Sequence, residues 1–494
     1  MEIGFDNNLY RQKQKDHILE RIARFDGKLY LEFGGKLFDD YHAARVLPGF
    51  QKDAKIRLLC EMRDKAEVIF CISAGSIEKT KIRADLGISY EMDLLRQIDA
   101  LTALGLSVNS VVITQYTGQA AADEFVHKLN ARGVRNYIHR PIAGYPSDVD
   151  YVVSEKGYGS NPYIETTRPL VVVTAPGPGS GKLATCLSQV YHEHHRGVQA
   201  GYGKYETFPI WNIPLKHPVN LAYEAATADL DDVNMIDHYH LAAYGETTVN
   251  YNRDIEVFPV LNRIFETILG ESPYKSPTDM GVNMAGFCIS NDEVVREAAK
   301  AEIVRRYFES ACDYREGKCD ENTMLKCELL MERAEVSIED RRVVAPAKEK
   351  AAETGMPATA IELPDGRIIT GKTSSLLGSS SAALLDSLKA MAGIDDKVKL
   401  INPVVIVPVE ELKKTHLGHN NARLHLDETL LALAVSAPNN ENAAKALSCL
   451  SMLRGCEAHS TVILSQGDVQ TFKKLGINLT CEPQYRTKKL YHHN

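Results

Sequence analysis

A glycine-rich stretch at residues 174–182, Thr-Ala-Pro-Gly-Pro-Gly-Ser-Gly-Lys, carries the clearest chemistry in this sequence. It follows an apolar run at residues 170–173 and precedes a predicted helix over residues 183–195. A strand, a glycine-rich turn and a helix form the layout of a phosphate-binding loop. Glycines allow several backbone N–H groups to point at one anion, and the helix N-terminus adds partial positive charge. Lys182 adds a full positive charge at the end of the turn.

The stretch departs from the phosphate-loop pattern G-x-x-x-x-G-K-S/T at two positions. Pro176 stands in place of the first glycine, and Leu183 stands in place of the hydroxyl residue that binds Mg²⁺. We therefore expect a nucleotide, with any Mg²⁺ held elsewhere, or a phosphorylated metabolite as the ligand. The residues expected to bind it are Gly177, Gly179, Ser180, Gly181 and Lys182. The alternative is a tight strand–helix turn whose glycines allow close packing and whose lysine is only solvated.

A second stretch rich in glycine and serine spans residues 371–381 and precedes a predicted helix that ends near residue 391. It holds more hydroxyl groups than one helix N-cap requires, so Ser379, Ser380 and Ser381 are predicted to form a second anion site. Clefts between domains are preferred ligand sites, and domain closure would bring both stretches to one phosphate-bearing ligand. The alternative is a helix cap followed by a flexible turn.

Strands and helices alternate through the first 200 residues. This alternation predicts an α/β fold with a mostly parallel, doubly wound sheet. Ligands bind beyond the carboxyl ends of such strands, so the turns that follow the strands are expected at one edge. These turns lie at residues 73–76, 114–118, 139–140 and 174–182. Arg140 lies in one of them, and we expect it to neutralise charge that develops during phosphate transfer.

Three domains are predicted. Residues 1–235 form the α/β domain with the glycine turn, residues 236–345 a helical domain, and residues 346–494 a second α/β domain. The helical domain is expected because the 3.6-residue apolar spacing recurs at residues 254–269, 292–314 and 321–336. In the last domain we expect a hairpin over 360–370 and buried strands at 404–407 and 460–464. The aromatic, proline-rich stretch 201–220 is expected to have little regular structure.

Metal-binding patterns are weak. The zinc-protease pattern H-E-x-x-H, begun by His192, fails because Arg196 stands where the second histidine is needed. Cysteines 312 and 319, and 449 and 456, are spaced too widely for common zinc sites. An acidic, histidine-rich stretch at 229–240 has enough carboxylates for Mg²⁺, but helix capping and surface solvation are the favoured explanation. We predict no structural zinc and assign no metal ligands.

The composition is that of an ordinary globular protein. The 494 residues are 44% hydrophobic and 25% charged, with a formal net charge of −8. This charge argues against nucleic-acid or membrane partners with broad contact surfaces. No stretch approaches the length of an apolar membrane span, and the first residues carry no export signal. The ten scattered cysteines fit reduced thiols, so we expect a cytoplasmic protein, and we expect it to form homo-oligomers.

Five motifs resemble a bacterial family. They are residues 32–36 (Glu-Phe-Gly-Gly-Lys), 83–87 (Arg-Ala-Asp-Leu-Gly), the 174–182 loop, 208–212 (Phe-Pro-Ile-Trp-Asn) and 373–381. The sequence resembles domain of unknown function 1846, also called uncharacterised protein family 0371, nearly from end to end. The resemblance implies a cytosolic, multidomain α/β protein from bacteria. It implies no reaction, and no catalytic residue is carried over from it.

The residues themselves favour a cytosolic enzyme that binds a small phosphorylated ligand and transfers or hydrolyses a phosphate group. Lys182 and Arg140 are the expected catalytic residues, since positioning and electrostatics supply most of the catalysis in phosphoryl transfer. An ATP-dependent phosphotransferase or phosphohydrolase is the matching enzyme class. The alternatives are a non-catalytic protein that senses a nucleotide, and a structural assembly protein with a vestigial loop.

Overall fold

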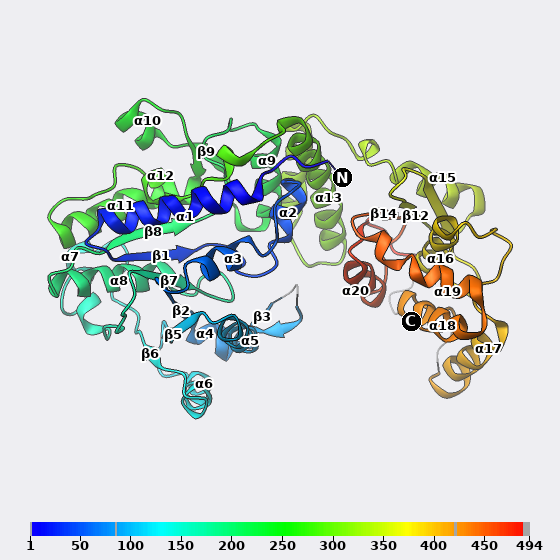
Figure 1. The fold of residues 1–494 in the computed structure, drawn as a ribbon, viewed down its shortest axis with the longest axis horizontal. Helices are drawn as coiled ribbons and strands as arrows, with labels where there is room; N and C mark the ends of the chain where they lie inside the picture. Colours follow the sequence, from blue (N-terminus) through cyan, green and yellow to red (C-terminus); the bar gives the residue numbers. More distant parts are fainter. Residues whose placement is uncertain (1, 84–85, 419–421, 488–494) are drawn as a thin grey trace. The chain divides into compact units, whose positions relative to one another are not determined.

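A computed structural model describes residues 2–83, 86–418 and 422–487 (Figure 1). The chain divides into two units, Met1–Ala299 and Lys300–Asn494. The three-domain division predicted from the sequence differs from these units: the border at 235/236 falls within strand β9 (Asn234–Ile236), and the border at 345/346 falls within helix α15 (Val344–Thr354). The middle segment does not stand apart because one of its strands, β11, belongs to the sheet of the first unit.

The first unit is built on a wholly parallel sheet with the strand order β11-β8-β1-β7-β2-β5-β6 (Figure 1). The strands are β1 (Leu29–Phe33), β2 (Ala66–Ser73), β5 (Ser107–Thr114), β6 (Asn136–Ile138), β7 (Leu170–Thr174), β8 (Gly201–Tyr205) and β11 (Gly281–Val282). Every residue of β1, β7 and β2 is buried, as expected where helices cover both faces of a parallel sheet. The predicted multidomain α/β fold with a mostly parallel sheet is confirmed.

Helices connect and cover these strands. The longer ones are α1 (Asn7–Arg24), α3 (Ala54–Glu61), α5 (Tyr90–Ala103), α6 (Ala120–Ala131), α8 (Lys182–His195), α9 (Pro218–Ala226) and α11 (Asn252–Leu269). The short elements are α2 (Tyr41–Val46), α4 (Ala74–Glu78), α7 (Val149–Val152), α10 (His238–Tyr244), α12 (Pro277–Met280), β3 (Ile82–Arg83), β4 (Ile88–Ser89) and β10 (Val249–Tyr251). In the parts of the chain that the structure describes, no helix combines the length and the hydropathy that crossing a membrane requires.

The direction of the chain along the sheet reverses between β7 and β2. From β2 the chain continues to β5 and β6 on one side, whereas from β7 it passes β1 and continues to β8 on the other side. The carboxyl ends of β7 and β2 therefore flank a topological switch point, which is where open α/β sheets bind ligands. The glycine-rich loop begins at this point, because it follows β7 directly.

The second unit contains a four-stranded mixed sheet with the order β13-β12-β14-β15. The strands are β12 (Ala358–Glu362), β13 (Ile368–Lys372), β14 (Glu457–Ser460) and β15 (Asn478–Cys481). The helices are α14 (Glu321–Arg333), α15, α16 (Ser379–Ala392), α17 (Pro403–Glu411), α18 (Leu426–Ser436), α19 (Glu441–Ser448) and α20 (Gln466–Leu475). Helix α13 (Asp292–Arg315) contains the position in the sequence at which the two units divide. The predicted hairpin is β12–β13, and the three predicted middle helices are α11, α13 and α14.

Two predicted strands of this unit are wrong in part or in full. Residues 404–407 lie in helix α17, because Pro403 suits the first helical position and Asn402 caps the helix through Val404 N–H. A short aliphatic run does not by itself distinguish a buried strand from a helix. The strand expected at 460–464 ends at Ser460. In the first unit, the sequence predicts little regular structure for the stretch 201–220, but the stretch begins with strand β8 and ends in the first turn of α9.

We predict that Gly371 in β13 tolerates no side chain. A Cβ there would lie 2.6 Å from the Cα of Ala383, a backbone atom of α16 that cannot rotate away. Gly371→Ala should lower the free energy of unfolding by about 1–3 kcal/mol, as overpacking does. Gly467→Ala in α20 is the matched control, since its Cβ would meet only the Ser465 hydroxyl at 3.9 Å. Urea unfolding of both variants tests this, and equal stability of the two would contradict the packing seen here.

Candidate functional site

The glycine-rich loop joins the end of β7 to the start of α8. Gly179 and Gly181 have φ angles of +67° and +81°, in the left-handed region that glycine adopts without strain. Gly181 is the N-cap of α8 and has no side chain that could accept from the first N–H groups of the helix. A helix leaves its first four N–H groups without partners inside the helix. The loop therefore directs the positive end of α8 toward the switch point of the sheet.

Close packing explains two of these glycines without a ligand. A Cβ on Gly177 would lie 2.5 Å from a ring carbon of Tyr90, and a Cβ on Gly181 would lie 2.9 Å from the Cβ of Thr114. The Thr114 hydroxyl also donates to the carbonyl of Ser180 at 2.7 Å. Gly179 is different, because the space around its missing Cβ is open. Only its backbone conformation requires glycine.

Ser180 carries a buried hydroxyl within the loop. The residue is 5% exposed, and its Oγ has no hydrogen-bond partner among the residues that the structure describes. A buried hydroxyl without a partner costs about 1–3 kcal/mol. A ligand oxygen at the loop would give this group the partner that the protein does not.

Lys182, in the first turn of α8, faces a carboxylate of the sheet. Its Nζ lies 3.7 Å from Oε1 of Glu32, and the hydroxyl of Tyr202 donates to the other Glu32 oxygen at 3.0 Å. Glu32 belongs to β1, which pairs with β7 on one side and β8 on the other. The sheet itself therefore brings the lysine and the carboxylate together.

A second lysine and two more carboxylates adjoin Glu32. Lys204 is the register partner of Glu32 in the β1–β8 pair, and its Nζ lies 2.7 Å from Glu206 Oε1 and also contacts Asp254, in the first turn of α11. Burial raises the pKa of Glu206, and Lys204 partly opposes that rise. Burial alone would lower the pKa of Lys204, but Asp254 and Glu206 raise it, so the ammonium stays charged.

These five residues, Glu32, Lys182, Lys204, Glu206 and Asp254, are called the charged cluster below. Their side chains are 11–21% exposed, so they are shielded from water but reach it. The Lys204 ammonium lies between two carboxylates, where a divalent cation would lie in a metal site. Among the described residues, no group of three His, Cys, Asp or Glu side chains is arranged to hold a metal ion. His192, which begins the failed zinc-protease pattern, contacts a backbone carbonyl, and so does His195, which lies three residues later on the same helix.

Arg140 lies further along the sheet edge. It follows β6, and both β2 and β5 lie between β6 and β7. Three strand spacings of about 4.8 Å separate β6 from β7 by about 14 Å. The Arg140 guanidinium lies 5.7 Å from the centre of the Tyr116 ring, and its backbone N–H donates to Asn161. Its catalytic role stays a prediction, and it requires a ligand that extends along the edge.

The serines of the second predicted anion site are occupied within their own unit. Ser379 accepts from the Thr359 hydroxyl at 2.9 Å, and Ser380 donates to Asp468 at 2.8 Å. Ser381 donates to a backbone carbonyl at 3.2 Å, and all three serines are buried. These bonds account for hydroxyl residues at the start of α16 without a ligand. An anion site here, and its sharing of a ligand with the glycine-rich loop, stay predictions.

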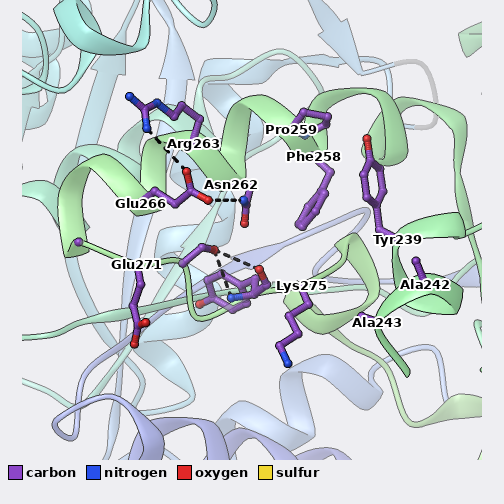
Figure 2. Close-up of a pocket in the computed structure, with 13 residues that line it drawn as sticks. Tyr239, Ala242, Ala243, Phe258, Pro259, Asn262, Arg263, Glu266, Glu271 and Lys275 are labelled. Atoms are coloured by element: carbon purple, nitrogen blue, oxygen red, sulfur yellow. Dashed lines mark hydrogen bonds and ion pairs between the residues drawn. The ribbon is translucent and has the colours of Figure 1, made fainter. Parts of the chain in front are cut away.

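A pocket of about 890 Å³ lies elsewhere in the first unit, between α10, α11 and the loop after α11 (Figure 2). Figure 2 shows Tyr239 and Phe258 on one side of it, and Glu266 accepting from Asn262 while it faces Arg263. None of its lining residues belongs to the glycine-rich loop or to the charged cluster. We place the candidate site at the loop, because the switch point, the helix N-terminus and the charged cluster coincide there.

Sequence reasoning missed most of the charged cluster. Glu32 does carry a signal, since it interrupts a strand that is otherwise apolar or aromatic. Lys204 carries none of this kind, because its strand β8 contains two glycines and is not evident from the sequence. A charged residue in a central strand of a parallel sheet is seldom buried without a partner. Asp254 and Glu206 carry no such signal, because only the tertiary fold brings them to Lys204.

We expect Lys204→Met to lower the free energy of unfolding by about 2–3 kcal/mol. Removing one partner of a fully buried ion pair costs roughly 3–5 kcal/mol, and the cost is smaller here because these groups still reach water. The loss should grow with pH. Lys204 opposes the rise in the pKa of Glu206, so its removal raises that pKa further. A carboxyl whose pKa is higher in the folded than in the unfolded protein lowers stability as the pH rises through its folded pKa.

Denaturant unfolding of this variant at about pH 5.5 and about pH 8.5 checks the prediction. Lys128→Met is the matched control, because the Lys128 side chain is 54% exposed and lies 3.6 Å from its partner Glu91. It should change stability by less than about 1 kcal/mol at either pH. If the Lys204 variant lost more stability at the acidic pH than at the basic pH, the interaction between the Lys204 ammonium and the Glu206 carboxylate would not explain the stability of the cluster.

Comparison with known proteins assigns the whole chain to one family. The model for "Domain of unknown function DUF1846, N-terminal" matches residues 3–335, and its C-terminal counterpart matches residues 339–491. A UPF0371 protein of Streptococcus thermophilus (strain CNRZ 1066) is 58% identical over 488 residues, and one of Streptococcus pneumoniae (strain Hungary19A-6) is 56% identical over 488 residues. Each alignment covers 99% of both chains. As its motifs predicted, the chain belongs to the DUF1846 family, whose members are also named UPF0371 proteins.

Proposed function

We propose that this protein binds a phosphorylated small molecule, with nucleotides as the first class to test, at the loop between β7 and α8. One observation carries the proposal: the loop places the N-terminus of a 14-residue helix, with Lys182 in its first turn, at the switch point of a parallel sheet. The open space at Gly179 and the unpartnered hydroxyl of Ser180 support it further.

Glu32 opposes the binding of a phosphate at the loop. Its carboxylate lies 3.7 Å from the Lys182 ammonium, so an incoming phosphate competes with it for the same cation. A phosphate brings more charge than a carboxylate, and it can also accept from the N–H groups in the first turn of α8. Glu32 also accepts a hydrogen bond from the Tyr202 hydroxyl, and that bond does not involve Lys182. The pair therefore holds the lysine in place until a sufficiently charged ligand arrives.

The reaction we propose breaks the P–O bond to the leaving group and forms a new one, to water in hydrolysis or to a hydroxyl of a second substrate in transfer, with Lys182 stabilising the charge that develops on the phosphate group. Binding without turnover is the second candidate, since Leu183 occupies the position where phosphate loops carry the Mg²⁺-binding hydroxyl. The net charge of −8 and the ten free cysteines support a cytoplasmic protein with small-molecule partners, not nucleic acid or membrane. Release of phosphate from Mg·ATP by the intact protein separates the two candidates, and failure to bind ATP or pyrophosphate would leave a structural role.

Lys182→Ala should weaken binding of ATP and of inorganic pyrophosphate at least about tenfold, because a hydrogen bond to a charged group contributes about 1.5–3 kcal/mol. Isothermal titration of the folded variant measures this, with and without Mg²⁺. Lys128→Ala, which removes an exposed lysine far from the loop in sequence, should bind as the wild type does. Equal affinity of Lys182→Ala and the wild type would refute binding at the loop.

Glu32→Gln should have the opposite effect and tighten the binding of pyrophosphate several-fold. The amide keeps an oxygen for the Tyr202 hydroxyl but no longer competes for the Lys182 ammonium. The same titration measures it. Weaker binding would show instead that the Glu32 carboxylate contributes to the ligand site, for example through a cation that the ligand brings.

A further inference from the structure

Glu206 follows strand β8 directly and lies at the carboxyl edge of the first sheet. Lys204, two residues earlier, is paired with Glu32 of β1, and residues two apart in a strand point to the same face. The pairing continues past the ends of both strands, because the N–H of Gly34 donates to the last carbonyl of β8 at 3.0 Å. Glu206 therefore lies on the sheet face where Lys182 of α8 meets Glu32.

The Glu206 side chain reaches across the end of β1 toward the glycine-rich loop. A Cβ added to Gly34 would lie 3.4 Å from Cγ and 3.6 Å from Oε1 of Glu206. Strand β1 separates β8 from β7, and neighbouring strands lie about 4.8 Å apart. By crossing β1, the carboxylate leaves about one strand spacing between itself and the strand that carries the loop. That space suits one water molecule, which needs about 3 Å to its base and about 3 Å to the phosphorus that it attacks.

The carboxylate of Glu206 keeps one oxygen for a further partner. Its Oε1 lies 2.7 Å from the Lys204 ammonium, and Lys204 is its one side-chain hydrogen-bond partner among the described residues. Glu32 differs, since Lys182 and the Tyr202 hydroxyl contact its two oxygens. The Glu206 side chain is 17% exposed, so a water molecule can reach it while bulk solvent is largely excluded.

The surroundings of Glu206 favour a carboxylate that takes up a proton near neutral pH. Its ionisable neighbours come from five elements and are Glu32 on β1, Lys204 on β8, Tyr223 on α9, Tyr251 on β10 and Asp254 on α11. Burial raises the pKa of Glu206, the Lys204 ammonium opposes that rise, and the two carboxylates add to it. Burial also raises the pKa of both tyrosines, so they stay neutral. A carboxyl whose pKa lies closer to the working pH is a better general base.

We propose that Glu206 is the general base of a phosphoanhydride hydrolase and takes a proton from the water that attacks a phosphate bound at the glycine-rich loop. This inference rests on the function proposed above for the loop. The water oxygen forms a bond to phosphorus while its proton passes to Glu206 Oε2. The P–O bond to the leaving group breaks, and its electron pair stays on the leaving oxygen.

The substrate class follows from the leaving group. A phosphate departs as an anion and takes up no proton at the moment of cleavage, whereas an alcohol needs a proton from an acid. Glu206 supplies a base, and Lys182 supplies positive charge for the phosphate that is transferred. A nucleoside triphosphate or inorganic pyrophosphate therefore fits the site. After cleavage, Glu206 returns its proton to solvent.

Hydrolysis of Mg·ATP and of magnesium pyrophosphate by the full chain tests the proposal. The wild-type rate should fall as the pH is lowered from about 8 to about 5.5, a range in which an ordinary glutamate stays largely ionised. Glu206→Gln should lower the rate about 100- to 10,000-fold and remove this pH dependence. Isothermal titration should show that this variant binds pyrophosphate at least as tightly as the wild type, because the amide removes a negative charge.

Glu482→Gln in the second unit is the matched control. The Glu482 side chain is 18% exposed and lies 2.9 Å from the Lys348 ammonium, so its surroundings resemble those of Glu206. The control should keep both the rate and its pH dependence. Lys204→Met gives a second readout if Glu206→Gln does not fold. It removes the cation that opposes the rise in the pKa of Glu206, so the fall in rate should move to higher pH.

The outcomes separate this inference from the proposed function. A wild type that does not bind pyrophosphate would refute both. A wild type that binds pyrophosphate but hydrolyses neither substrate would leave the loop as a binding site and overturn the role of Glu206. Hydrolysis by Glu206→Gln at the wild-type rate, or an unshifted pH dependence in Lys204→Met, would also overturn it, because another group would then take the proton.

Discussion

The pairing of β1 with β7 on one side and β8 on the other is the interaction on which the candidate site depends. It sets Glu32 opposite Val173, just before the glycine-rich loop, and opposite Lys204 of β8. Paired positions share one face of a sheet, so the charged cluster needs no loop movement to assemble. The cost of placing charges in largely buried strands is offset by ion pairs and by the Tyr202 hydroxyl. A rigid sheet edge therefore presents both signs of charge beside the positive end of α8.

The part of this arrangement that is local in sequence could be predicted. Apolar runs that alternate with helical spacing gave a parallel sheet, and glycines after β7 marked the loop. The strand β8 could not be found in this way, because glycine is a poor strand former. Position 201 of this strand is a glycine because a Cβ there would lie 2.5 Å from a ring carbon of Phe25. Strand register, which joins Glu32 to Lys204, is a tertiary property that one sequence does not display.

The strand wrongly predicted at residues 404–407 has a different cause from the missed strand β8. Its residue types favour strands, whereas the glycines of β8 disfavour them. β-branched residues favour strands on average, but that preference is largely a preference for a half-buried, pleated surface. Here Pro403 and the Asn402 cap start a helix, and the expected burial does not follow within the chain. Taking the aliphatic run as a buried strand assumed that apolar residues are covered by their own chain. Val404 and Val407 are 76% and 57% exposed, so the assumption does not hold for this helix.

Close packing accounts for some residues of the glycine-rich loop but not for all of them. Contacts with Tyr90 and Thr114 account for Gly177 and Gly181, so these two glycines do not argue for a ligand. Gly179 has no neighbour at its Cβ position, and Ser180 has a buried hydroxyl without a partner. The positive φ of the turn explains glycine at position 179, whereas the buried hydroxyl of Ser180 costs stability in the empty protein, and a turn selected only for tight packing has no reason to keep it. Uncompensated costs of this kind gather at functional sites, and here such a cost lies next to the lysine that begins α8.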